Sequence, residues 1–325
     1  MAERCLLSGL ARRWAAVGLA VMLMALSGCA WWDAKEVQLA LRPTPGRPAG
    51  LPGDDQLFKP GDERWLAEVP GATGAAGAKT DRLALWWLPQ PDPDAPALLY
   101  LHGTFRNLYQ NLSKINALRD AGYAVLAVDY RGWGDSTVIV PSEATISADA
   151  ATAWAELQRR QPLAAKRVVF GHSMGGAVAV RLASGLKGGL QPGHDYGALV
   201  LESTFTRLPD VAAVAGFWGR IAAVATRLDF DSLSRIQRVD APILMLHGTA
   251  DRTVPIELGR RLRDAAPPGV QWVQIEGGTH SRLHSDAPQI YRDALQSVMP
   301  QSLWPQPSTD GQKRIPAKPS RDASP

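Results

Sequence analysis

The residues Gly171-His172-Ser173-Met174-Gly175 form a Gly-x-Ser-x-Gly pattern that could present a serine as a nucleophile. An apolar, β-rich run at Arg167–Phe170 precedes the pattern, and a helix-prone segment follows it. A sharp strand-to-helix turn of this kind exposes a serine hydroxyl, and the small residues two positions before and after leave room for it. Because the chain holds 30 glycines, five residues alone are weakly specific, so partners for Ser173 must be found elsewhere.

The segments that must position this serine alternate between apolar runs and helix-like stretches. The predicted strands are 64–69 and 83–88, which open the domain as a hairpin, and then 97–101, 123–129, 167–170, 198–201, 243–246 and 270–275. The predicted helices are 112–121, 143–160, 174–186, 256–265 and 288–298. Such alternation predicts an α/β fold with a mostly parallel central sheet and helices on both faces.

Polar residues follow several of these strands where each one ends. Asp251 comes soon after 243–246, and His280 comes soon after 270–275. Since ligands collect beyond the carboxyl ends of parallel strands, we expect both side chains near Ser173. A serine hydroxyl needs an imidazole to take its proton, so His280 is assigned as the base. Asp251 would hold that imidazole in the correct tautomer.

The developing oxyanion needs hydrogen-bond donors as well. We assign this role to the backbone N–H groups of Met174, after the serine, and of Thr104, after the strand 97–101. Two alternatives stay open for the side chains, because Glu202 also ends a strand and His284 lies only four residues beyond His280.

The remaining polar residues of these turns are interpreted as structural. We expect His102, His172 and His247 to hold loops by hydrogen bonds, and His194 to be solvated. Asp129, Arg131 and Asp135 are expected to brace a turn. No Cys, His or carboxylate cluster has metal-ligand spacing, so neither a metal nor a cofactor is expected.

From residue 63 to residue 298, the sequence resembles the α/β-hydrolase superfamily. The matching segments, in order, are LLYLHGTFRN, VLAVDYRGWGDS, PSEATISADA, VVFGHSMGGAVA, ALVLESTF, FDSLSRI, PILMLHGTADRTVP and EGGTHS. The chain is most similar to the monoglyceride-lipase-like and depalmitoylase-like serine hydrolases. This resemblance implies the α/β-hydrolase fold and an esterase, lipase or thioesterase that acts through an acyl-enzyme on Ser173, with the order Ser173, Asp251, His280.

An insertion at about 203–240 carries apolar residues at helical spacing and is predicted to form a small helical cap. We expect Phe105, Trp133 and Trp218 to line an acyl pocket beneath it, and the substrate to be a small-molecule or lipid ester. Two other functions remain open. One is an acyltransferase that uses the same acyl-enzyme, and the other is a non-catalytic lipoprotein that binds within the cell envelope.

The N-terminus resembles a bacterial lipoprotein signal. Arg12 and Arg13 precede an apolar run that ends in Leu26-Ser27-Gly28-Cys29. Residues 1–28 are therefore expected to be cleaved and Cys29 lipidated, which places the protein on the bacterial envelope, at the outer membrane. We expect a flexible tether at 29–62, a hydrolase domain at 63–299 and a disordered tail at 300–325. The formal net charge of +4 comes without a basic block, so no nucleic acid partner is expected.

Overall fold

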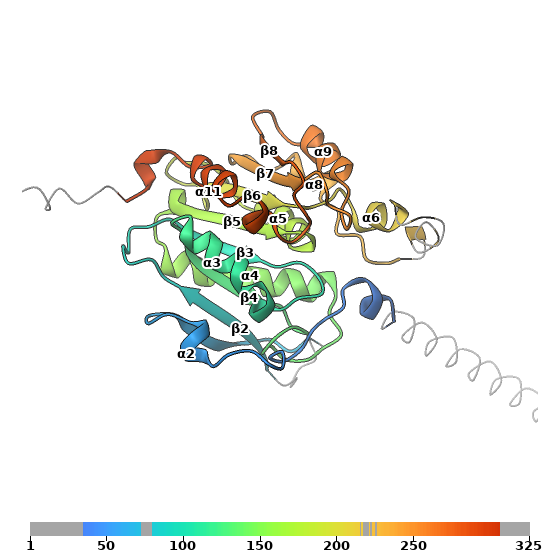
Figure 1. Ribbon diagram of the computed structural model, residues 1–325, viewed down its shortest axis with the longest axis horizontal. Coiled ribbons are helices and arrows are strands. Elements are labelled where there is room, and N and C mark those ends of the chain that lie inside the picture. The colour runs from blue at the N-terminus through green and yellow to red at the C-terminus, as the bar shows by residue number, and fades with distance from the viewer. Residues whose placement is uncertain are drawn as a thin grey trace, which may run out of the picture.

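The computed structural model describes residues 35–72, 80–214, 216, 221, 223–224 and 226–305, and these include one eight-stranded sheet (Figure 1). The strands are β1 (Glu63–Val69), β2 (Asp81–Leu88), β3 (Ala97–Leu101), β4 (Ala124–Asp129), β5 (Arg167–His172), β6 (Ala198–Glu202), β7 (Ile243–Gly248) and β8 (Gln271–Ile275). Their spatial order is β1-β2-β4-β3-β5-β6-β7-β8. The pairs β1–β2 and β2–β4 are antiparallel, and the other pairs are parallel. The predicted mostly parallel α/β sheet is confirmed.

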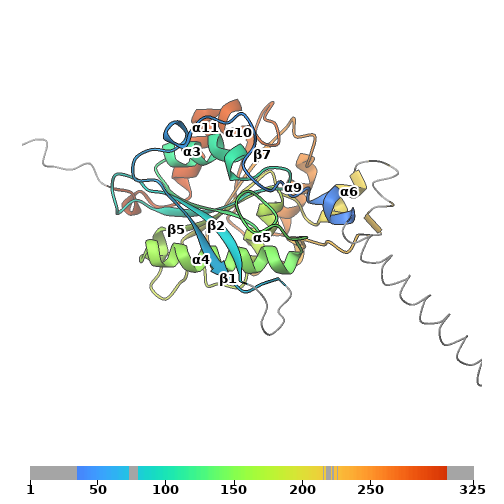
Figure 2. The same ribbon diagram turned by 90° about the horizontal axis from the view of Figure 1, so that it is seen from below.

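Helices cover both faces of this sheet, as Figure 2 shows for α4 and α5 on one side and α3, α10 and α11 on the other. The α-helices are α2 (Asp54–Leu57), α3 (Leu112–Asp120), α4 (Glu143–Arg160), α5 (Met174–Ala183), α6 (Leu208–Val214), α8 (Leu233–Ile236), α9 (Ile256–Ala265), α10 (Leu283–Asp286) and α11 (Pro288–Ser297). Short 3₁₀ turns span Leu108–Asn111, Ala164–Lys166 and Gln301–Leu303. No helix in the described part of the chain is long and apolar enough to cross a membrane.

The central strands are buried on both faces, and their side chains alternate between two apolar clusters. In β3, Leu99 and Leu101 belong to the cluster under α4, α5 and α9, whereas Leu98 and Tyr100 belong to the cluster under α3 and α11. This division follows from the two-residue period of a strand. Because every residue of β3 is buried, the run reads as continuously apolar in the sequence.

The segment at 29–62 was expected to be a flexible tether, and for its described residues that expectation is wrong. Leu41 is fully buried in the core. The Asn107 side-chain amide donates hydrogen bonds to the carbonyls of Thr44 (3.1 Å) and Gly46 (2.8 Å). We call residues 35–46 the N-terminal strap. The domain binds the strap through these carbonyls and through the side chains of Val37 and Leu41, which pack into the core. Two buried apolar residues are too few to give a clear periodic pattern in the sequence.

At the C-terminus and in the insertion, the structure also differs from the boundaries that the sequence predicts. Trp304 was assigned to the tail, but it is buried edge-on against Tyr123, with ring centroids 4.9 Å apart. A large aromatic gains more from this burial than a short polar tail costs to order. The insertion contains α6 and α8, and the helical spacing predicted beyond Val214 reaches residues outside the described ones. Cys29, Trp218 and residues 306–325 also lie outside them.

Candidate active site

Ser173 stands at the turn between β5 and α5, at the carboxyl end of the central strand. Its backbone adopts φ 56° and ψ −123°, a left-handed conformation that is rare outside glycine. The turn is tight because its two glycines lie directly against the backbone of neighbouring segments. A Cβ added at Gly175 would lie 2.0 Å from the Leu101 carbonyl oxygen, and one at Gly171 would lie 2.3 Å from the Gly175 oxygen. The two glycines of the motif are thus required by close backbone approach.

The structure brings together the three side chains that the sequence analysis assigned to catalysis. His280 Nε2 lies 2.9 Å from Ser173 Oγ, and His280 Nδ1 lies 2.8 Å from Asp251 Oδ2. Each residue follows a different strand, β5, β7 or β8, so the sheet itself fixes their separation. Asp251 is buried, whereas the side chain of His280 retains 15% exposure at the pocket.

The charge of the Asp251 carboxyl determines which nitrogen of His280 carries a proton. Burial alone would raise the pKa of the Asp251 carboxyl, but hydrogen bonds from His247 and His280 and from the Val254 N–H outweigh it and lower that pKa. The carboxylate is therefore ionised at neutral pH and can only accept. The Nδ1 of His280 must carry a proton toward it, which leaves Nε2 free to accept the proton of Ser173.

The loop after β3 runs against the serine. A Cβ added at Gly103 would lie 2.9 Å from Ser173 Cβ. The Gly103 carbonyl accepts a hydrogen bond from His102 Nδ1 (2.7 Å). Burial lowers the pKa of His102 to about 4, so this ring is neutral at pH 7. Since the carbonyl and N–H of one trans peptide point in opposite directions, this bond directs the Thr104 N–H away from His102.

The other expected oxyanion donor is the N–H of Met174. Met174 is the first residue of α5, where backbone N–H groups have no acceptor within the helix. The assignment of the Thr104 and Met174 N–H groups to an oxyanion hole stays a prediction.

A pocket of about 180 Å³ opens beside the serine. Its lining residues are Gly103, Thr104, Phe105, Arg106, Asn111, His172, Ser173, Thr253, His280 and Ser281. The expected apolar acyl wall is only partly present. Phe105 lines the pocket, but Trp133 does not, because it is fully buried against His102 and Tyr130. Its position soon after the end of β4 predicts a place near the pocket, but the large side chain of Trp133 fills the core beneath the loop instead.

The two alternative catalytic residues have other partners. Glu202 is fully buried, pairs with Lys114, and accepts a hydrogen bond from the Tyr291 hydroxyl (2.8 Å). His284 Nε2 contacts the Ser113 hydroxyl at 3.2 Å. The buried ion pair was missed by the sequence analysis. Its only signal is a lysine within the apolar face of the helix that starts at Leu112.

Asp129, Arg131 and Asp135 brace their turn, as expected, and His194, which was expected to be solvated, is partly exposed. Arg131 Nε binds Asp149 (2.8 Å), and its guanidinium also reaches Asp81 (2.9 Å). Asp129 accepts from the Leu108 N–H, and Asp135 accepts from the Tyr109 hydroxyl. His194 Nδ1 lies 2.7 Å from the Gln191 carbonyl.

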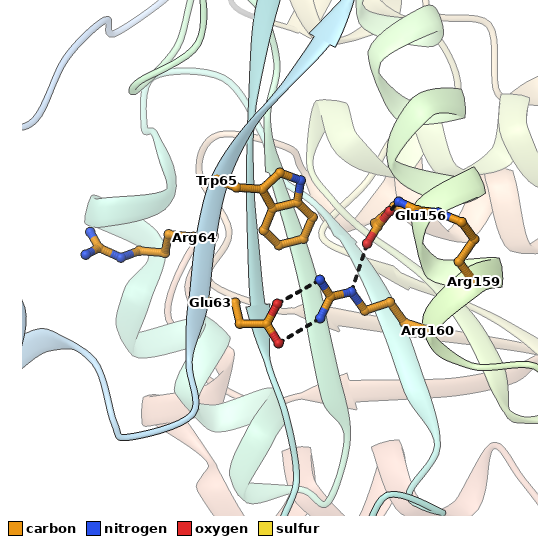
Figure 3. A pocket seen from close by; sticks show the side chains of 6 residues that line it. All are labelled: Glu63, Arg64, Trp65, Glu156, Arg159 and Arg160. Carbon is orange, nitrogen blue, oxygen red and sulfur yellow. Dashed lines mark hydrogen bonds and ion pairs between the residues drawn. The ribbon is translucent and has the colours of Figure 1, made fainter.

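A larger hollow, of about 490 Å³, lies at the outer edge of the sheet near β1 and α4 (Figure 3). There Arg160 sits between Glu63 and Glu156 and forms ion pairs of 2.8 Å with both. Its guanidinium also stacks 4.8 Å from the Trp65 ring centroid. These charges already neutralise one another and no nucleophile is among the lining residues, so the candidate active site is the smaller pocket at Ser173.

The family model described as serine aminopeptidase, S33, matches residues 93–233. An uncharacterized protein of Mycobacterium tuberculosis is 33% identical over 225 residues, which are 66% of this chain and 76% of that protein. The lysophosphatidylserine lipase ABHD12 of Danio rerio is 32% identical over 219 residues, which are 62% of this chain and 54% of the lipase. An esterase of Pyrococcus furiosus superposes with a TM-score of 0.57 at 19% identity, over 78% of this chain and 95% of the esterase.

The chain belongs to the α/β-hydrolases. The resemblance noted in the sequence is thereby confirmed, together with the fold it implied. The chain spans about half the length of the first curated relatives, 54% for the lipase of Danio rerio and 50% for human ABHD12B. In the described part of this α/β-hydrolase, no cluster of three or more His, Cys, Asp or Glu side chains could hold a metal ion.

Proposed function

We propose that this α/β-hydrolase is a serine hydrolase that cleaves carboxylic esters or thioesters of lipids through an acyl-enzyme on Ser173. The observation that carries the proposal is the continuous chain of hydrogen bonds from Ser173 Oγ through His280 to Asp251, with both distances under 3 Å. Distances of this length allow the hydroxyl proton to pass directly to the imidazole.

The proposed reaction has two stages, formation of the acyl-enzyme and its hydrolysis, and Ser173 and His280 take part in both. His280 Nε2 takes the hydroxyl proton as Ser173 Oγ bonds to the acyl carbon, and the carbonyl oxygen becomes an oxyanion facing the N–H groups of Thr104 and Met174. When the bond to the leaving alcohol or thiol breaks, His280 returns the proton to it. A water molecule then repeats both steps on the acyl-enzyme and releases the acid.

The lipid nature of the substrate is proposed from the relatives. Several α/β-hydrolases similar to this chain are named lysophosphatidylserine lipases. Single-chain glycerolipid esters are therefore the first substrates to test, beside acyl thioesters of the same chain lengths.

A fluorophosphonate probe tests the nucleophile, because it phosphonylates only a serine activated by a base. We expect labelling of the wild-type chain, none of Ser173→Ala, and normal labelling of Ser184→Ala, which alters a half-buried serine at the C-cap of α5. Folded wild-type protein that resists the probe would refute a catalytic role for Ser173.

We further propose that the chain is anchored to the bacterial outer membrane by a lipid on Cys29. The lipobox-like sequence Leu26–Cys29 supports this proposal. Metabolic incorporation of an alkyne-labelled fatty acid, lost in Cys29→Ala, would test the modification, and separation of inner and outer membranes would test the location.

A further inference from the structure

Arg106 lies among the residues that line the pocket around Ser173. It follows the oxyanion loop, two positions after Thr104, and its side chain is exposed. Of the lining residues, it is the one with a permanent charge. The other polar groups are uncharged hydroxyls and amides, together with the imidazoles of His172 and His280. The pocket therefore presents a single fixed cation beside the nucleophile.

The positive charge of Arg106 is not neutralised within the described residues, where no carboxylate lies within ion-pair distance of it. The two buried carboxylates nearest the serine are already matched: Asp251 binds His280, and Glu202 binds Lys114. The charge of Arg106 also affects the pKa of Lys114. Burial is the main reason that the pKa of Lys114 is lowered, and repulsion from Arg106 acts in the same direction.

A guanidinium without an ion-pair partner in a pocket is suited to binding an anionic ligand group. Its planar fork of donors binds phosphate and carboxylate oxygens in pairs, and such charged hydrogen bonds are about twice as strong as neutral ones. The hydroxyls of Thr253 and Ser281 supply further donors in the same pocket. By contrast, the pocket offers a long apolar chain little beyond the ring of Phe105.

We infer that Arg106 binds a phosphate group on the alcohol portion of the ester substrate and so determines substrate specificity. Resting on the proposed function, this inference assigns the pocket to the glycerophosphate end of a lysophospholipid, while the acyl chain leaves by another path. A neutral monoacylglycerol has the same scissile ester but offers Arg106 no anion. The enzyme should therefore prefer the phosphorylated substrate.

Two substrates with one acyl chain test this preference: 1-oleoyl-lysophosphatidic acid and 1-oleoylglycerol, in the same neutral detergent. In Arg106→Gln, the ratio of their kcat/KM values should fall about tenfold to a hundredfold, through KM of the phosphorylated substrate. Arg106→Lys keeps the charge without the fork and should give an intermediate ratio. Arg238→Gln, at the opposite end of the sheet before β7, should leave the ratio within about twofold of wild type.

A binding measurement separates this inference from the proposed function. Calorimetry compares Ser173→Ala with the double variant Ser173→Ala/Arg106→Gln, and neither needs catalysis. We expect the double variant to bind lysophosphatidic acid about tenfold more weakly. Equal affinities would overturn the role of Arg106. A persistent difference in affinity, with a wild-type chain that hydrolyses no ester, would instead retain the anion site and reject the hydrolase.

Discussion

The imidazole of His172 donates a hydrogen bond from Nε2 to the backbone carbonyl of His280, at 3.0 Å. Burial lowers the pKa of His172 well below its ordinary value, so the ring is neutral, and the nitrogen that faces a carbonyl oxygen must be the protonated one. The residue just before the nucleophile thus holds the loop that carries the proposed base.

Removing this hydrogen bond should slow catalysis without unfolding the protein. His172→Phe keeps a ring of similar volume but has no donor, so His280 should lose its fixed orientation. We expect kcat on p-nitrophenyl butyrate to fall about tenfold to a hundredfold, with KM little changed. The far-UV spectrum and Tm serve as the control for folding, and an unaltered kcat would contradict the positioning role.

The tight turn between β5 and α5 should not accommodate a methyl group at Gly175. Alanine there would place Cβ 2.0 Å from the Leu101 carbonyl oxygen, so the backbones of α5 and β3 would have to move apart. Gly175→Ala should lower the free energy of unfolding by more than about 3 kcal/mol and abolish probe labelling. Gly185→Ala is a matched control, because its added Cβ meets nothing closer than 3.5 Å. Equal Tm values for the two variants would disprove the steric argument.

The buried pair of Lys114 and Glu202 predicts a strongly non-additive mutant cycle. Lys114→Met leaves the Glu202 carboxylate buried without its cation, which typically costs about 3–5 kcal/mol. Lys114→Met/Glu202→Gln removes both charges and keeps an acceptor for the Tyr291 hydroxyl, so it should recover most of that stability. Urea unfolding of the two single variants and the double variant measures the coupling. Additive effects would show that the two side chains do not act as a pair.

Stability should fall on mild acidification because of His102. Its pKa is about 4 in the folded chain, against about 6.5 for an unfolded histidine. Above pH 6.5 neither state binds the proton; between pH 6.5 and 4 only the unfolded state binds it, so the free energy of unfolding declines by up to about 3 kcal/mol. Burial also lowers the pKa of His172 and His284, which add to the same slope. In urea titrations at pH 7.5, 6.0 and 5.0, His102→Asn should therefore make the slope shallower without abolishing it. A variant with an unchanged slope would exclude His102 as the cause.

The N-terminal strap makes a prediction about the oxyanion loop. Asn107→Asp replaces the amide that binds the Thr44 and Gly46 carbonyls with a group that can only accept, so the strap should detach. We expect Tm to fall and esterase kcat to fall with it, because the Phe105 N–H donates to the Leu41 carbonyl of the strap. Asn111 lines the pocket and its amide donates to the Arg106 and Asn107 carbonyls, not to the strap. Asn111→Asp therefore shows how much kcat is lost when only the pocket side is altered. Full activity in a folded Asn107→Asp protein would show that the strap does not affect the active site.

The fold and the three central residues could be predicted because they leave direct marks in the sequence. Buried parallel strands are continuous apolar runs, and Ser173 and Asp251 each follow such a run, whereas His280 follows the partly exposed edge strand β8. The strap could not be predicted in the same way, since only Val37 and Leu41 of its side chains are buried in the core and its other contacts use backbone carbonyl groups. Trp133 was misplaced for a related reason: a strand-end position fixes where the backbone lies, but not whether a side chain turns toward the pocket or the core.

The hydrogen bond between Leu41 and Phe105 bears on how a shortened version of this protein should be designed. Phe105 has φ 71°, a conformation that a bulky residue holds only when its surroundings enforce it. Glu36 reaches in the other direction and accepts from the Arg227 N–H at 2.9 Å, in the insertion above the site. A recombinant chain cut at Glu63, where the first strand begins, would lose both restraints. A shortened chain that keeps both restraints must therefore include Glu36.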